Sequence, residues 1–122
     1  MSGVSEKLAP GRRVVDLGDG VQARVRVAKI KRLREFEELW SEQGSDSNDF
    51  EAGCLMAQWG LVGCDGLLDE DGNEVQFATE EHPRLGIIAA RSVVYCMTAS
   101  QVVRLQQAIV DANVVTSATR KN

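Results

Sequence analysis

The stretch from Trp59 to Phe77 most constrains the fold of this chain, because it joins a tryptophan, glycine-rich corners and two short apolar arms. Asp71-Gly72-Asn73 supplies residues that tolerate positive φ, as the turn of a β-hairpin requires. The arms that flank this turn contain the apolar residues Leu67, Leu68, Val75 and Phe77. We therefore predict a helix ending near Trp59, then a glycine-broken corner and a central β-hairpin.

Two helices are expected before this central hairpin. The first is predicted over residues 28–43, because apolar side chains recur at helical spacing. The second is predicted from Asp49 to about Gly60, with an apolar band that includes Leu55 and Leu61. The apolar stripe of the first helix comprises Ile30, Leu33, Phe36, Leu39 and Trp40.

Two further helices are expected after the central hairpin. Thr79-Glu80-Glu81 is typical of a helix start, and the nearly continuous apolar segment from Leu85 to Met97 is typical of a buried helix. Thr98 and Gln101 have the spacing of a capping box, which predicts a last helix running to about Ala112. The residues of this helix that we expect to face inward are Val102, Val103, Leu105, Ile109 and Val110.

An N-terminal β-hairpin is predicted over residues 12–27, because Val21, Ala23, Val25 and Val27 alternate with polar residues. This apolar face must pack on helices or pair with another strand, for which the central hairpin is the obvious candidate. The expected fold is α+β and mainly helical, with four helices and two hairpins. We expect a flexible N-terminus at 1–11, a single domain at 12–112 and a flexible tail at 113–122.

Composition and charge argue against two classes of binding partner, nucleic acids and membranes. A chain of 122 residues with a net charge of −4 and interspersed charges lacks the clustered basic face of a nucleic-acid-binding protein. No apolar run reaches the length of a membrane span, and the N-terminus has no apolar signal-peptide core. These features predict a cytoplasmic protein with neither nucleic-acid nor membrane partners.

The sequence offers little for catalysis or cofactor binding. The three cysteines lack metal-ligand spacing, and His82 is the single histidine. An EF-hand reading of the acidic turn would place Leu67 and Ala78 where the first and last carboxylate ligands belong. We therefore expect the protein to be non-enzymatic, with no catalytic residue and no bound metal or cofactor.

The charges of the first predicted helix oppose its dipole. Lysine and arginine occupy its start, and glutamate fills its second half. This pattern fits either a solvated face with local ion pairs or a partner surface with separate positive and negative parts. The basic residues are Lys29, Lys31, Arg32 and Arg34.

Residues 12–100 as a whole resemble the tail assembly chaperones of long-tailed bacteriophages and prophages. In that family, a helix ending near a tryptophan precedes a hairpin of the form W-x-G-hydrophobic-x-D-x-x-G-x-x-h-x-F-S/T. The matching positions are Trp59, Gly63, Leu67, Leu68, Asp69, Asp71, Gly72, Val75, Phe77 and Thr79. Arg32–Leu39, after a short hairpin, is similar to the family's opening. Cys64-Asp65 departs from the pattern, because the family commonly has another large apolar residue or a second tryptophan in this segment after Trp59.

The resemblance implies an assembly factor of the host cytoplasm that is absent from the mature virion. Its partners would be the tape-measure protein and the tail-tube protein, and it could form a homo-oligomer. We place the partner surface at Trp59, Leu61, Val62 and Leu67; the alternative is that these side chains pack in the core. A competing reading is a head–tail connector or tail-completion subunit that forms a ring, and a third is an unrelated small binding domain or regulator.

Overall fold

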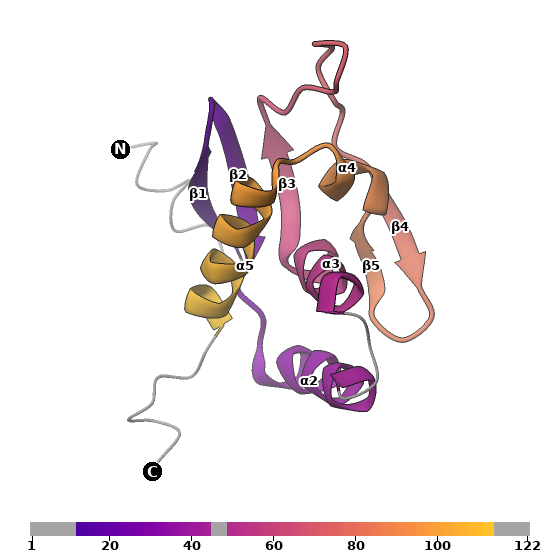
Figure 1. The fold of residues 1–122 in the computed structure, drawn as a ribbon. Coiled ribbons are helices and arrows are strands. Elements are labelled where there is room, and N and C mark those ends of the chain that lie inside the picture. The colour runs from indigo at the N-terminus through magenta and orange to yellow at the C-terminus, as the bar shows by residue number, and fades with distance from the viewer. Residues whose placement is uncertain (1–11, 45–48, 114–122) are drawn as a thin grey trace, which may run out of the picture.

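The computed structural model describes residues 12–44 and 49–113, and the predicted flexible ends lie largely outside this range. The described part contains four helices and five strands in an α+β arrangement, as predicted (Figure 1). The strands are β1 (Arg12–Gly18), β2 (Val21–Arg26), β3 (Leu61–Asp65), β4 (Thr79–His82) and β5 (Gly86–Ala89). The helices are α2 (Ile30–Gly44), α3 (Asp49–Gly60), α4 (Arg91–Tyr95) and α5 (Ala99–Asn113).

The predicted N-terminal hairpin is confirmed as the antiparallel pair β1–β2. Its turn residues Gly18, Asp19 and Gly20 have φ values of 93°, 57° and 80°, a left-handed run that suits glycine and tolerates aspartate. Every second residue of β2 is buried, which fits the predicted alternation. Helix α5 crosses this sheet and covers its apolar face (Figure 1).

The third strand of this sheet is β3, which pairs antiparallel with β2 through Ala23 and Cys64. We had predicted a corner here and had included Leu61 in the preceding helix, and both expectations were wrong. The absence of a side chain at Gly63 leaves room for Arg24 of β2 to lie over this position. Arg24 then reaches an Asp65 carboxylate at 2.6 Å, which ties the two strands together.

The predicted central hairpin is present with very short arms, because the Asp69 N–H donates to the Asn73 carbonyl at 2.9 Å and the Val75 N–H to the Leu67 carbonyl at 2.8 Å. Leu68 and Glu74 form an isolated bridge, and Gly72 has the expected positive φ of 85°. The Asp69 side chain accepts hydrogen bonds from the backbone N–H groups of Asp71 and Asn73, each at 2.9 Å. Turn chemistry therefore explains the acidic residues, and β3 takes the place beside β2 that we had expected this hairpin to occupy.

The predicted helix at Leu85–Met97 is wrong in its first part. Gly86 has a φ of 78°, and β5 then pairs antiparallel with β4. Ile87 is exposed while Ile88 is buried, which is the alternation of a strand rather than of a helix. Only the later residues form the short helix α4.

The predicted helix start at Thr79–Glu81 is strand β4, so this prediction was also wrong. The Glu80 carboxylate accepts hydrogen bonds from the Arg91 backbone N–H at 3.0 Å and from Gln58 Nε2 at 3.2 Å. It therefore joins β4 to the start of α4 and to α3. His82 Nδ1 accepts backbone hydrogen bonds from the turn that follows, so the histidine holds a β-turn.

The capping box before α5 is confirmed. The Thr98 N–H donates to Gln101 Oε1 at 2.9 Å, and the Gln101 N–H donates to Thr98 Oγ1 at 3.1 Å. The helix ends at Asn113, one residue beyond the prediction, and Asn113 is buried rather than part of a flexible tail.

Candidate functional site

Three of the four residues predicted to bind a partner lie in the core. Trp59 and Leu61 are each 1% exposed and Leu67 is 2% exposed, whereas Val62 is half-buried. Trp59 lies in the last turn of α3, which ends at Gly60, and β3 begins at the next residue, Leu61. The correction is that these four side chains do not form an exposed patch.

Trp59 instead anchors α2 to the rest of the molecule. Its indole stacks on Phe36 of α2 with ring centroids 4.5 Å apart and an interplanar angle of 19°. Arg26 lies 5.4 Å from the indole centroid, and its Nε donates to the Trp59 carbonyl at 2.8 Å. The indole Nε1–H is buried and has no hydrogen-bond partner among the described residues.

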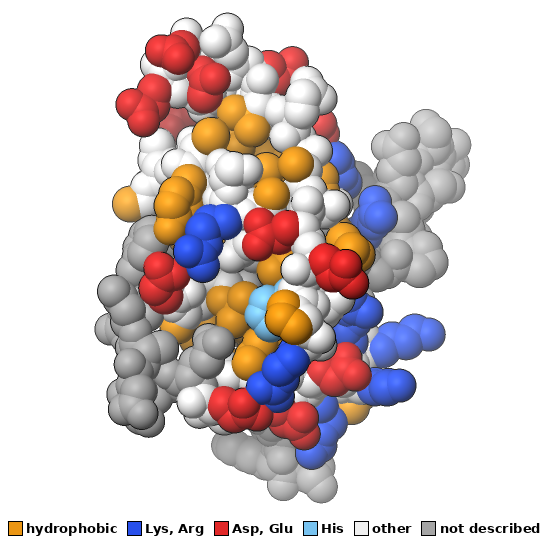
Figure 2. Space-filling model, turned by 90° about the vertical axis from the view of Figure 1, so that its right-hand side faces the viewer, with side chains coloured by type: hydrophobic (Ala, Val, Ile, Leu, Met, Phe, Trp, Pro, Cys, Tyr) orange, Lys and Arg blue, Asp and Glu red, His pale blue; other side chains and the backbone are white. Residues whose placement is uncertain are grey.

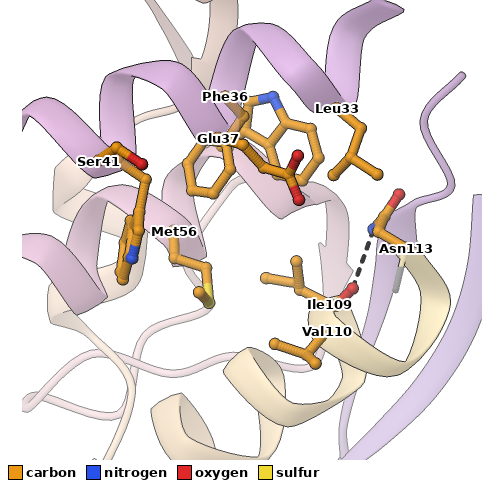
Figure 3. A pocket seen from close by; sticks show the side chains of 10 residues that line it. Leu33, Phe36, Glu37, Ser41, Met56, Ile109, Val110 and Asn113 are labelled. Atoms are coloured by element: carbon orange, nitrogen blue, oxygen red, sulfur yellow. Dashed lines mark hydrogen bonds between the residues drawn. The ribbon is translucent and has the colours of Figure 1, made fainter. Parts of the chain in front are cut away.

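An apolar groove of about 410 Å³ lies beside this contact, between α2, α3 and α5 (Figure 3). Figure 3 shows side chains from facing helices pointing toward the same hollow. The lining residues are Leu33, Phe36, Glu37, Trp40 and Ser41 of α2, Met56 and Trp59 of α3, and Ile109, Val110 and Asn113 of α5. We call this hollow the helix groove.

The helical period of α2 explains one wall of the helix groove. Leu33, Phe36 and Trp40 recur at i, i+3 and i+7 and therefore project from one face. Leu33 and Phe36 are buried, but Trp40 stays half-buried at the groove. Ile30, which we had included in the same stripe, is 58% exposed and lies outside the groove lining.

Asn113 sets the opposite end of the helix groove. Its Oδ1 accepts from the Ala28 N–H at 2.7 Å, and its Nδ2 donates to the Arg26 and Ile109 carbonyls at 2.6 and 2.9 Å. These bonds attach the end of α5 to the segment that leads into α2. They hold the first turn of α2 near α5, while later turns stand further away across the hollow (Figure 1).

The lining of the helix groove is mainly apolar. Seven of its ten lining residues are apolar, and the polar ones are a glutamate, a serine and an asparagine. In residues 12–44 and 49–113, no cluster of three or more His, Cys, Asp or Glu is placed to hold a metal ion. Cys54 and Cys64 are buried elsewhere, and burial raises the pKa of both thiols.

Sequence reasoning missed Met56, Val110 and Asn113 as parts of one site. The apolar period of α5 had placed Val110 and Ile109 on the inward side, but nothing local marked Val110 as half-buried. Val103, which we had also expected to face inward, is 62% exposed. A long-range feature decides this difference, namely the position of α2 relative to α5.

Comparison of the chain with protein-family models, curated proteins and solved structures finds no match. Within the described part of the chain, none of the helices has both the length and the apolar character needed to cross a bilayer. The relation to tail assembly chaperones therefore stays a prediction from the sequence.

Proposed function

We propose that this chain is a non-enzymatic tail assembly chaperone that binds an apolar helix of the tape-measure protein. The observation that carries the proposal is the helix groove, which the described residues leave open. Its chemistry suits helix-in-groove recognition, in which side chains at i, i+3, i+4 and i+7 enter an apolar channel. The motif of residues 59–79 supports the choice of partner.

The groove supplies both a rigid and an adaptable wall. Trp59 is fixed by its stack on Phe36, so one wall is preorganised. Met56 and Trp40 are half-buried, and an unbranched methionine adapts its shape to different apolar side chains. A volume of about 410 Å³ accommodates a few apolar side chains of one short helical segment.

A protein of this kind would keep apolar stretches of the tape-measure protein soluble while tail-tube subunits assemble around it. It would act in the host cytoplasm and remain outside the mature virion. Binding through a shallow groove of this size favours repeated, reversible contacts along a long helix, because each contact buries little area.

The test is co-expression of the full chain with its tape-measure protein, followed by affinity capture and measurement of soluble tape-measure protein. Val110→Asp places a carboxylate in the groove and should weaken capture about tenfold or more. Val103→Asp is the matched control, because the same change on the same helix falls at a 62% exposed site outside the groove lining.

Equal capture by wild type and folded Val110→Asp protein would refute the groove as the binding site. Failure of the wild type to capture the tape-measure protein would refute the chaperone assignment itself. A stable closed ring that forms without the tape-measure protein would favour the connector alternative.

A further inference from the structure

A second hollow, of about 590 Å³, lies where β2 leads into α2. Four of its seven lining residues are basic, and its single acidic residue is Glu35. Figure 2 shows one face of the molecule, with several lysine and arginine side chains along its lower right edge. The lining residues are Arg26, Val27, Ala28, Lys29, Lys31, Arg32 and Glu35, and we call this hollow the basic pocket.

Among the described residues, the hydrogen-bond acceptors of the two arginines of the basic pocket are neutral backbone carbonyls. Arg26 donates to the carbonyls of Trp59 at 2.8 Å and Ile87 at 3.4 Å. Arg32 Nη2 donates to the Leu85 carbonyl at 3.2 Å, and its Nε is buried without a hydrogen-bond partner within residues 12–44 and 49–113. In the described ranges, neither arginine forms an ion pair with a carboxylate.

Two partly buried guanidinium groups of the pocket therefore lack a directly bonded carboxylate within the described ranges. Burial, followed by the neighbouring charges of Arg32 and Arg12, lowers the pKa of Arg26 to about 10. The first turn of α2 contains no acidic residue, so the helix dipole adds to the positive potential. Partly buried charges are normally paired, and an anion in the pocket would therefore relieve an existing electrostatic cost.

We propose that the basic pocket binds a side-chain carboxylate of an acidic segment in a protein partner. A guanidinium group matches a carboxylate in shape and can donate two parallel hydrogen bonds to it. A nucleic acid fits less well, because the chain has a net charge of −4 and the pocket itself contains Glu35.

The basic pocket and the helix groove meet at one short segment. Asn113 lines the groove and bonds to Ala28 and Arg26, both of which line the pocket. Lys31, Arg32 and Glu35 of the pocket nevertheless lie on the side of α2 opposite the groove residues, so an acidic segment in the pocket is distinct from the helix in the groove. Assignment of that segment to the tape-measure protein rests on the proposed function, whereas carboxylate binding by the pocket does not.

The pocket is tested by NMR titration of the full chain, with the Nε–H signals of its arginines as the readout. The probes are a soluble peptide of glutamate and alanine and the same peptide with every glutamate replaced by glutamine. We expect the glutamate peptide to shift the Arg26 and Arg32 signals saturably, and the glutamine peptide to leave them unchanged. Added salt should weaken the effect.

Matched variants separate the pocket from general charge attraction. Lys29→Gln combined with Lys31→Gln removes two exposed charges from the pocket lining and should weaken peptide binding about fivefold. Arg34→Gln removes an exposed charge from the same helix outside the pocket lining and should change affinity less than about twofold.

The proposal is overturned if the arginine signals do not move, or if Arg34→Gln weakens binding as much as the lysine pair. Tighter binding of inorganic phosphate or of a single-stranded oligonucleotide at the same signals would also overturn the carboxylate assignment. Capture of the tape-measure protein without any effect of the lysine changes would reject the pocket's role there and leave the proposed function intact. Peptide binding by the pocket without capture of the tape-measure protein would reject the proposed function and leave the carboxylate-binding pocket intact.

Discussion

Replacement of Trp59 by alanine should lower the free energy of unfolding substantially, because this side chain is buried rather than part of a surface contact. Deleting a buried tryptophan typically costs about 3–5 kcal/mol, and loss of the stack on Phe36 contributes within that range. Trp59 also lines the helix groove, so the new cavity would open into an existing hollow of about 410 Å³. We expect a loss of about 4 kcal/mol from a total of about 5–15 kcal/mol.

Trp59→Phe is the informative companion variant. It keeps a ring that can stack on Phe36, and it removes an indole N–H that is buried without a hydrogen-bond partner. Removal of an unsatisfied donor offsets part of the free-energy cost of the smaller side chain. We therefore expect the free energy of unfolding to fall by about 1 kcal/mol.

Urea denaturation followed by far-UV circular dichroism measures both effects. With a slope of about 1.5 kcal/mol/M, the midpoint should fall by about 2.7 M for Trp59→Ala and about 0.7 M for Trp59→Phe. A Trp59→Ala protein within about 1 kcal/mol of wild type would refute the placement of this side chain in the core.

Three further predictions test other contacts of the fold. Gly66 and Gly72 both have a φ of 85°, but a Cβ at Gly66 would collide with the Gly20 carbonyl oxygen, whereas nothing lies within 4 Å at Gly72. Alanine at position 72 should therefore cost about 1–2 kcal/mol and alanine at position 66 clearly more, as measured by thermal unfolding; equal costs would contradict the close approach. Asn113→Ala removes the acceptor for the Ala28 N–H, so it should cost about 1–3 kcal/mol and speed hydrogen exchange at that amide, and unchanged exchange would contradict the attachment. The hydrogen bond from Arg84 lowers the pKa of Glu42 below its ordinary 4.5. At neutral pH the wild-type protein should therefore have a slightly larger free energy of unfolding than Glu42→Gln protein. That advantage should vanish as pH falls below 4.5 and through the folded-state pKa, and an advantage that grows in acid would contradict the ion pair.

Local patterns identified the elements whose structure depends on neighbours in sequence. The alternation in residues 21–25 predicted a strand, and the Thr98–Gln101 spacing predicted a helix start, because each signal acts within a few residues. Residues 86–89 were misjudged because a short apolar run is compatible with either a buried helix or a strand. Pairing with β4 and the left-handed turn at Gly86 decided the outcome.

The candidate site depended on distant contacts and was largely hidden in the sequence. Burial of Trp59 follows from its stack on Phe36, 23 positions earlier in the chain. Val110 and Val103 are both valines of α5, and only the position of α2 leaves one beside a groove and the other exposed. The basic start of α2 was visible in the sequence, but the sequence did not show that Arg26 and Arg32 lack a carboxylate partner among the described residues.

The chain contains a direct probe of the helix groove, because both of its two tryptophans, Trp40 and Trp59, line it. Titration with tryptophan-free segments of the tape-measure protein should give a saturable blue shift of tryptophan emission as the half-buried Trp40 loses water. The shift should persist unchanged in Val103→Asp protein, whereas folded Val110→Asp protein should need about tenfold more of the segment, or still higher concentrations, to show the same shift. Tape-measure binding detected by calorimetry without any change in tryptophan emission would contradict the groove as the site of recognition.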